Sequence, residues 1–316
     1  GKHDMSEPEI LVVGAGVVGL AFGISAAKRG FNVRVIDQQV RPQAPSELGA
    51  NVLAVNRVSE AFLTDLGAWR HIDAKYRTLY RKMRVIDATG TGQIGFGESE
   101  NESVSLGHIV NQSALKHALI VTAENTVGLS LAWQSEFDDR AARPALLVAA
   151  DGVNSRVRQA LGLQTVGFKY QQSATVCLVE FEHAHQECAF QWFHETGPVA
   201  LLPLSEPNLS AMVWSCSGNV DELDDDNLKA ELARCTERHL GEILAVGPRM
   251  SFGLTQRHAL RYVDHGVALL GDAAHTIHPL AGQGANLGFA DANALVTEIC
   301  GAELEGKSPG DLTILK

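Results

Sequence analysis

The sequence predicts an α/β fold in which a nucleotide-binding domain, built from separated segments, carries an inserted antiparallel sheet. Short apolar runs followed by helical periodicity recur near the N-terminus, in the middle and near the C-terminus, as in parallel βαβ units. Between residues 174 and 217 the apolar period is two, which is typical of antiparallel strands. We therefore assign 1–75, 99–165 and 256–316 to the nucleotide-binding domain, and 76–98 and 166–255 to the inserted domain.

The first βαβ unit occupies the N-terminal segment. Ile10 to Val13 is a continuous apolar run, as expected of a parallel strand buried on both faces. Apolar residues then recur at helical spacing from Val17 to Arg29, and Gly30 follows where a helix terminus favours a left-handed residue. Residues 32–36 predict a second strand, which ends at Asp37.

The same periodicities predict the remaining elements. In the nucleotide-binding segments we expect helices at 59–66, 113–124, 154–161 and 285–300, with Asn111 as the N-cap of the second, and strands at 128–133, 145–149 and 267–270. A hairpin is expected at 83–94, turning at 87–90. The inserted domain should contain strands at 174–181, 189–194, 200–203 and 211–215 and one amphipathic helix at 224–240.

Composition excludes several classes of function. The 316 residues carry a net charge of −11, which argues against a nucleic-acid partner because no basic surface would neutralise phosphates. No apolar stretch approaches the length that spans a bilayer, and residues 1–9 show no signal-peptide pattern. The five cysteines are widely spaced and odd in number, so we expect reduced thiols and a soluble, cytoplasmic protein.

The clearest chemical motif is the glycine-rich run Gly14-Ala15-Gly16-Val17-Val18-Gly19, placed directly after a strand and before a helix. The first glycine permits a tight turn, the second lets the backbone approach a pyrophosphate, and the third allows close helix–sheet packing. Asp37 ends the next strand, where its carboxylate can accept hydrogen bonds from a ribose. The pattern predicts dinucleotide binding; the alternative is a glycine-rich turn without a ligand.

Two further motifs follow apolar strands. Asp151-Gly152 suits a polar site at the carboxyl edge of the sheet, although the segment could equally be a helix cap. In the stretch 270–291, Gly271-Asp272 ends a strand, where the aspartate could hold a ribityl hydroxyl. His278-Pro279 then precedes a glycine-rich turn that opens a helix, whose amides could stabilise negative charge on a reduced flavin ring. A glycine-rich loop with a helix behind it is the alternative.

The run His278-Pro279-Leu280-Ala281-Gly282-Gln283-Gly284-Ala285-Asn286-Leu287-Gly288-Phe289-Ala290-Asp291 resembles the signature of the ubiquinone-biosynthesis ring hydroxylases. These enzymes are flavin monooxygenases related to para-hydroxybenzoate hydroxylase. The glycine turn at Gly14, the Asp151-Gly152 motif and Gly271-Asp272 match that family in order, so the resemblance extends from Ile10 to about Cys300. The runs 107–110 and 201–205 most resemble the member that hydroxylates ring position five of a polyprenylphenol.

The resemblance implies a Rossmann-type FAD-binding domain with an inserted antiparallel β-sheet substrate domain. It implies FAD as cofactor, NAD(P)H as electron donor, and a polyprenylphenol and oxygen as substrates; because the flavin carries the chemistry, no catalytic acid or base and no metal site is assigned. The implied cofactor-binding residues are Gly14, Ala15, Gly16, Val17, Gly19, Asp37, Gln38, Asn51, Gln112, Asp151, Gly152, Gly271, Asp272, Pro279, Gly282, Gln283, Gly284, Ala285 and Asn286. At Asn51 and Gln112 the family often has arginine, which bears on how firmly FAD is retained.

The polyprenyl tail implies an apolar channel along the inserted sheet and access from a membrane, so peripheral contact with the inner membrane face is compatible with the resemblance. A ubiquinone-biosynthesis protein complex and a homo-oligomer are compatible as well. Two other functions stay open: a flavin-dependent isoprenoid reductase or dehydrogenase, and an inactive flavoprotein scaffold. His183, His185 and Cys188 have spacing compatible with a metal, but a polar loop between strands explains them better.

Overall fold

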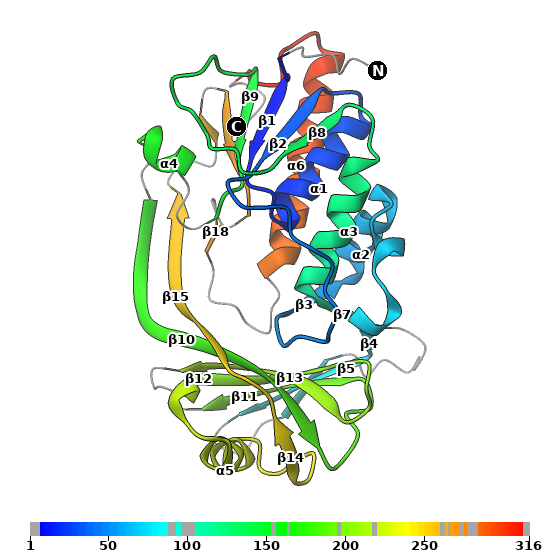
Figure 1. Ribbon diagram of the computed structural model, residues 1–316, viewed down its shortest axis with the longest axis vertical. Coiled ribbons are helices and arrows are strands. Elements are labelled where there is room, and N and C mark those ends of the chain that lie inside the picture. The colour runs from blue at the N-terminus through cyan, green and yellow to red at the C-terminus, as the bar shows by residue number, and fades with distance from the viewer. Residues whose placement is uncertain are drawn as a thin grey trace.

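The computed structural model describes residues 7–87, 93–96, 105–152, 156–162, 165–194, 197–216, 220–259, 263–264, 266–271, 275–276 and 284–311. The chain forms two parts, which the long strands β10 (Thr165–Phe181) and β15 (Met250–Ala259) connect (Figure 1). These strands continue through residues 165–166 and 255–256, where the sequence places domain boundaries. The boundaries themselves stay a prediction.

The first part contains a six-stranded sheet in the order β16-β17-β9-β1-β2-β8. Its strands are β1 (Ile10–Val13), β2 (Val33–Ile36), β8 (Leu129–Ala132), β9 (Leu146–Ala149), β16 (Val263–Asp264) and β17 (Val267–Leu269). All neighbours pair in parallel except β16 and β17, as the predicted βαβ units require. Fully buried apolar side chains fill the central strands, which is why these segments read as continuous apolar runs.

One face of this sheet is covered by a helical layer (Figure 1). It contains α1 (Val17–Lys28), α2 (Arg57–Leu66), α3 (Gln112–Glu124) and α6 (Gly284–Leu304). In this layer α1 and α3 lie against the strands, and α2 and α6 pack on α1. The N-cap predicted at Asn111 is confirmed, because its side chain accepts a hydrogen bond from the Ala114 amide at 2.9 Å. The other face packs against Phe137 of the segment after β8 and against α4 (Arg156–Ala160).

Short elements lie beside the helices. A three-stranded antiparallel sheet is formed by β3 (Val52–Asn56), β7 (Gly107–Asn111) and β4 (Arg77–Tyr80). The 3-10 turns are η1 (Trp69–His71), η2 (Ala74–Tyr76) and η3 (Val220–Glu222).

The second part is a nine-stranded sheet with the main order β18-β15-β10-β13-β12-β11-β5-β6 and β14 paired to β10. Besides β10 and β15 it contains β5 (Lys82–Asp87), β6 (Gln93–Phe96), β11 (Cys188–His194), β12 (Gly197–Pro203), β13 (Leu209–Cys216), β14 (Ile243–Val246) and β18 (His275–Thr276). One face packs against α5 (Asp225–Cys235) and the other against the three-stranded sheet. The fold is therefore the predicted one: a parallel nucleotide-binding sheet joined to a largely antiparallel sheet.

Two sequence predictions are wrong in detail. The inserted sheet is not antiparallel throughout, because β11 pairs in parallel with β5, a strand from much earlier in the chain. The helix expected at 224–240 ends at Cys235, since Glu237 and Arg238 take left-handed backbone angles that a helix does not continue through. The chain then turns into β14.

Candidate cofactor site

The three glycines of the turn between β1 and α1 have different structural roles. Gly14 has φ +110°, and a Cβ there would overlap the carbonyl oxygen of Ala150 and lie 2.7 Å from the Cα of Asp151. A Cβ at Gly19 would overlap the carbonyl oxygen of Gly14. These two glycines are therefore required for close packing of the turn, α1 and the end of β9.

Gly16 is not required by the packing of the protein itself. Its φ is −76°, which any residue can adopt, and a Cβ there would meet none of the described residues within 4 Å. Gly16 is the N-cap of α1, and within the described ranges no side chain caps the first amides of this helix. The turn therefore leaves open space in front of a positively polarised helix end.

The carboxylate of Asp37 accepts hydrogen bonds from two backbone amides beside the glycine turn. One carboxylate oxygen accepts a hydrogen bond from the amide of Ala15 at 2.9 Å, and the other accepts from the amide of Gln39 at 2.8 Å. The carboxylate thus ties the end of β2 to the glycine turn, a role that the sequence pattern does not reveal. Each oxygen keeps a second lone pair that can accept from a ligand hydroxyl.

Asp151, which follows β9, has one oxygen in use and one without a partner. Its Oδ2 accepts a hydrogen bond from the amide of Arg156, the first residue of α4, at 2.8 Å. The helix-cap alternative is therefore confirmed in part, with Asp151 as the acceptor of the bond. Its Oδ1 is buried and has no hydrogen-bond partner among the residues that the structure describes, which is costly unless a ligand or water supplies a donor.

These groups line one cleft of about 670 Å³ at the carboxyl ends of β1, β2 and β9. The cleft brings together the predicted residues Gly14, Gly16, Asp37, Gln38, Asp151 and Gly152. It is also lined by residues that the sequence analysis did not single out, namely Val13, Ile36, Gln39, Lys116, Ser135, Glu136, Phe137, Ala150 and Arg156. A polar cleft at this edge of a parallel sheet is where a dinucleotide binds.

Comparison with known proteins decides what kind of nucleotide-binding protein this is. Residues 7–313 match a family model described as an FAD binding domain. The chain is 35% identical to the 3-demethoxyubiquinol 3-hydroxylase of Escherichia coli, over 98% of this chain and 83% of that protein. This chain is an FAD-dependent monooxygenase.

Other relatives agree with this family. The flavin monooxygenase is 32% identical to the ubiquinone hydroxylase UbiL of Rhodospirillum rubrum, over 97% of this chain and 76% of that protein. It is 30% identical to the human mitochondrial ubiquinone biosynthesis monooxygenase COQ6, over 97% of this chain and 80% of that protein. Among solved structures, Pseudomonas aeruginosa PqsL, a probable FAD-dependent monooxygenase, matches with a TM-score of 0.74 at 20% identity, covering 98% of this chain and 89% of that one.

The comparisons confirm the predicted cofactor, enzyme class and fold. Members of this family use FAD and take electrons from NAD(P)H. They act on aromatic substrates and oxygen. Within the described ranges, no helix of the monooxygenase is both long and apolar enough to cross a membrane.

The two positions where the family often has arginine lie next to each other. The amide of Gln112 donates to the carbonyl oxygen of Asn51 at 3.0 Å, which joins the start of α3 to the residue before β3. Asn51 is exposed and Gln112 half-buried. Neither residue is among those that line the cleft.

The third group of predicted residues lies at the start of α6 and the end of β17. Gly284 is the first residue of α6 and is exposed, and a Cβ built on it would lie more than 4 Å from every described residue outside its own turn. Asn286 joins α6 to β3, because its Nδ2 donates to the carbonyl oxygen of Ala54 at 2.8 Å and its Oδ1 accepts from the amide of Asn56 at 3.1 Å. Gly271, with φ +59°, packs against Val18. Asp272, Pro279, Gly282 and Gln283 lie outside the described residues.

His185, from the predicted polar loop, is buried and used within that loop. Its Nε2 lies 2.8 Å from the carbonyl oxygen of Leu204, and its Nδ1 accepts from the amide of Glu187 at 3.1 Å. Both ring nitrogens thus hold the loop between β10 and β11.

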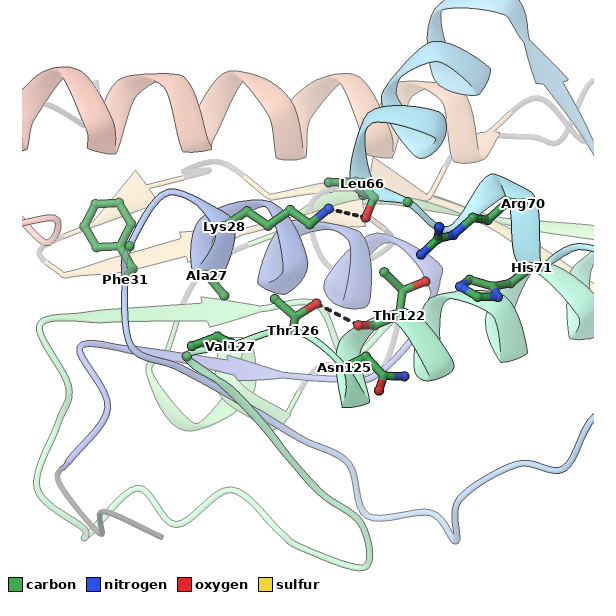
Figure 2. Close-up of a pocket in the computed structure, with 13 residues that line it drawn as sticks. Ala27, Lys28, Phe31, Leu66, Arg70, His71, Thr122, Asn125, Thr126 and Val127 are labelled. Atoms are coloured by element: carbon green, nitrogen blue, oxygen red, sulfur yellow. Dashed lines mark hydrogen bonds between the residues drawn. The ribbon is translucent and has the colours of Figure 1, made fainter. Parts of the chain in front are cut away.

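A second cleft, of about 530 Å³, lies where α1, α2 and α3 end (Figure 2). Lys28 donates to the carbonyl oxygen of Leu66 at 2.6 Å, and Thr126 donates to the carbonyl oxygen of Thr122. Arg70 and His71 also line this cleft (Figure 2). Helix carboxyl ends are negatively polarised, so Lys28 stabilises the end of α2 here, and the surroundings do not favour a phosphate.

Proposed function

We propose that this flavin monooxygenase hydroxylates the aromatic ring of a polyprenylphenol intermediate in ubiquinone biosynthesis. The observation that carries the proposal is the similarity, over nearly the whole chain, to three proteins. They are named as a demethoxyubiquinol hydroxylase, a ubiquinone hydroxylase and a ubiquinone biosynthesis monooxygenase. Ring position is the finer part of the proposal. The runs 107–110 and 201–205 favour position five, whereas the Escherichia coli relative is named a 3-hydroxylase.

The ADP half of FAD belongs, in this proposal, in the cleft at the glycine turn. Three features support the placement: the open space at Gly16, the uncapped amides at the start of α1, and the unpartnered Oδ1 of Asp151. A pyrophosphate in front of Gly16 would accept from the α1 amides. A ribose hydroxyl could donate to Asp37, and the buried Oδ1 of Asp151 would gain a donor from the cofactor or from a water it orders.

The flavin ring would then lie toward the start of α6. Gly284 and Ala285 open this helix, and a Cβ at Gly284 would meet no atom of the described residues within 4 Å. Asn286 contributes by fixing the helix on β3 rather than by reaching outward. Asp272, Pro279, Gly282 and Gln283 stay assigned to the flavin from the sequence alone.

The substrate would lie between this helix end and the nine-stranded sheet. The sheet face that packs against β3 and β7 carries mostly small or apolar side chains, including Ala200, Leu202 and Ala211. These side chains are already buried against the three-stranded sheet, so they do not form a surface for the prenyl tail. An apolar channel for the tail therefore stays a prediction from the family resemblance. Bound FAD would supply the redox chemistry with NAD(P)H and oxygen; the protein's part is to position the ring and to exclude water. Peripheral membrane contact, a biosynthetic complex and a homo-oligomer remain part of the proposal.

Product analysis tests the proposed function. Cells lacking one ubiquinone hydroxylase at a time are complemented with this chain, and the accumulated prenylphenols are identified by mass spectrometry. We expect ubiquinone to return in one of these strains, which identifies the ring position. Failure in every strain, with a purified protein that contains FAD but shows no phenol-dependent oxygen consumption, would favour the reductase alternative. A purified protein without flavin absorbance would favour the scaffold.

Replacing Gly284 with valine tests the placement of the flavin ring. The side chain would project into the space beside the helix start, while the ADP half stays anchored at Gly14 and Gly16. We expect partly retained flavin, loss of phenol hydroxylation, and residual oxygen consumption that yields peroxide. Normal hydroxylation by Gly284→Val would remove α6 from the active site.

A further inference from the structure

The cleft at the glycine turn contains a lysine that no motif predicts. Lys116 lies on α3, one helical turn after Gln112, and its half-buried side chain forms part of the wall shared with Gly14 and Gly16. Residues four apart lie on the same face of a helix, so Lys116 continues the face of α3 on which Gln112 stands.

The charges around the cleft make this lysine unusual. The lining contains three carboxylates, Asp37, Glu136 and Asp151, and two cations, Lys116 and Arg156. Arg156 is already paired, since its Nη1 lies 3.3 Å from an oxygen of Glu136. Lys116 forms neither an ion pair nor a side-chain hydrogen bond with any residue in the part of the chain that the structure describes.

An anionic ligand gives this arrangement a physical explanation. The pyrophosphate of FAD is an anion, and it would enter a cleft in which carboxylates outnumber cations. The α1 N-terminus offsets roughly half a charge. A lysine ammonium is a mobile point charge on a long stem, suited to a phosphate without requiring exact geometry.

We propose that Lys116 is a pyrophosphate-binding residue of the FAD site, supplying from α3 the positive charge that the glycine turn lacks. The inference rests on the proposed placement of the ADP half but not on the identity of the phenol. It also accounts for how FAD can be held although Asn51 and Gln112 are uncharged.

Titration of FAD-free protein tests this assignment. Lys116→Met keeps the length of the stem and removes the charge, and Lys116→Arg restores the charge. Lys229→Met, on α5 in the other part of the molecule, is the control for the change in net charge. The readouts are the Kd for FAD from fluorescence, its dependence on salt, and the melting temperature of the FAD-free protein.

We expect Lys116→Met to raise the Kd for FAD about tenfold, the lower end of what a charge-assisted hydrogen bond contributes. The variant should also flatten the salt dependence, while Lys116→Arg and Lys229→Met stay within about twofold of the parent. The melting temperature of FAD-free protein should not change, because Lys116 forms no bond with the described residues.

Competition with ADP and adenosine locates the contact. If Lys116 binds the phosphates, Lys116→Met weakens ADP about tenfold on the same estimate and leaves adenosine unchanged. Equal weakening of ADP and adenosine, or an unchanged Kd for FAD, would overturn the assignment. Gly16→Val distinguishes an error in the assignment of Lys116 from an error in the proposed placement of the ADP half. If it abolishes FAD binding while Lys116→Met is silent, only the lysine is wrong; if both are silent, the placement of the ADP half is wrong.

Discussion

Replacing Gly14 and Gly16 by alanine should have opposite consequences for folding and for cofactor binding. At Gly14 the methyl group would stand in the left-handed region, at about 1–3 kcal/mol, and would also overlap the backbone of Ala150. Together these effects should destabilise the FAD-free protein by about 3 kcal/mol or more. At Gly16 there is no overlap and no strained angle.

The stability of Gly16→Ala follows from two small effects of opposite sign. Alanine reduces the conformational entropy of the unfolded chain relative to glycine, which stabilises the folded protein by about 0.4–1 kcal/mol. Alanine is a poorer N-cap than glycine, and at the start of α1 this costs roughly the same amount, about 0.5–1 kcal/mol. The melting temperature of the FAD-free variant should therefore lie within about 3 °C of the parent.

Gly16→Ala should weaken FAD binding although it leaves the stability of the FAD-free protein unchanged. The methyl group at Gly16 would keep the pyrophosphate away from the first amides of α1, and losing two charge-assisted hydrogen bonds should raise the Kd about 100-fold or more. Thermal melting of FAD-free protein and fluorescence titration with FAD measure the two quantities on the same preparations. Stoichiometric FAD in Gly16→Ala, or a parent-like melting temperature for Gly14→Ala, would refute the division of tasks between these glycines.

Further substitutions test single contacts. Asp37→Ala should raise the Kd for FAD by one to two orders of magnitude, roughly, and also lower the melting temperature, since the carboxylate accepts two backbone amides. Asn286→Ala, which loses both bonds to β3, should cost about 1–2 kcal/mol in a urea unfolding experiment, and an unchanged midpoint would contradict its anchoring role. Lys28→Met should destabilise by about 1 kcal/mol in the same assay, without affecting FAD. Burial raises the pKa of the Cys177 thiol to about 11, so alkylation of native protein at pH 8 should modify the half-buried Cys300 and spare Cys177.

Local patterns explain why so much of the nucleotide-binding part was predictable from the sequence. The strand at Ile10, the turn and α1 are set by residues close in sequence, and the Asn111 cap depends on an amide three residues away. Pairing between distant segments leaves no such local signal. The parallel pairing of β5 with β11 joins residues 82–87 to 188–193, and nothing in either strand specifies this partner or its direction. The early end of α5 likewise depends on left-handed angles at Glu237 and Arg238, residues that favour helix in isolation.

In the candidate site too, local motifs predicted the residues of the glycine turn, whereas contacts between distant segments were not predictable. The motif identifies Gly14, Gly16 and Gly19 as one group, but only the structure shows that Gly16 alone faces open space. The bond from Ala15 to Asp37 and the position of Lys116 in the cleft depend on how β2 and α3 pack beside the turn. A sequence pattern contains no information about such contacts, because the partners are far apart in the chain.

Packing at Val18 connects the two ends of the proposed FAD site. Val18 lies in the first turn of α1, next to the glycine turn, and a Cβ at Gly288 of α6 would come within 2.6 Å of its Cγ2. A Cβ at Gly271, just after β17, would lie 3.3 Å from the Cβ of the same valine. The absence of side chains at Gly271 and Gly288 therefore lets the start of α6 approach α1 closely. On the proposed placement, this contact fixes the distance between the pyrophosphate at Gly16 and the flavin ring beside Gly284. The glycines at 271 and 288 would then serve cofactor binding without touching the cofactor, by holding two helix N-termini at one separation.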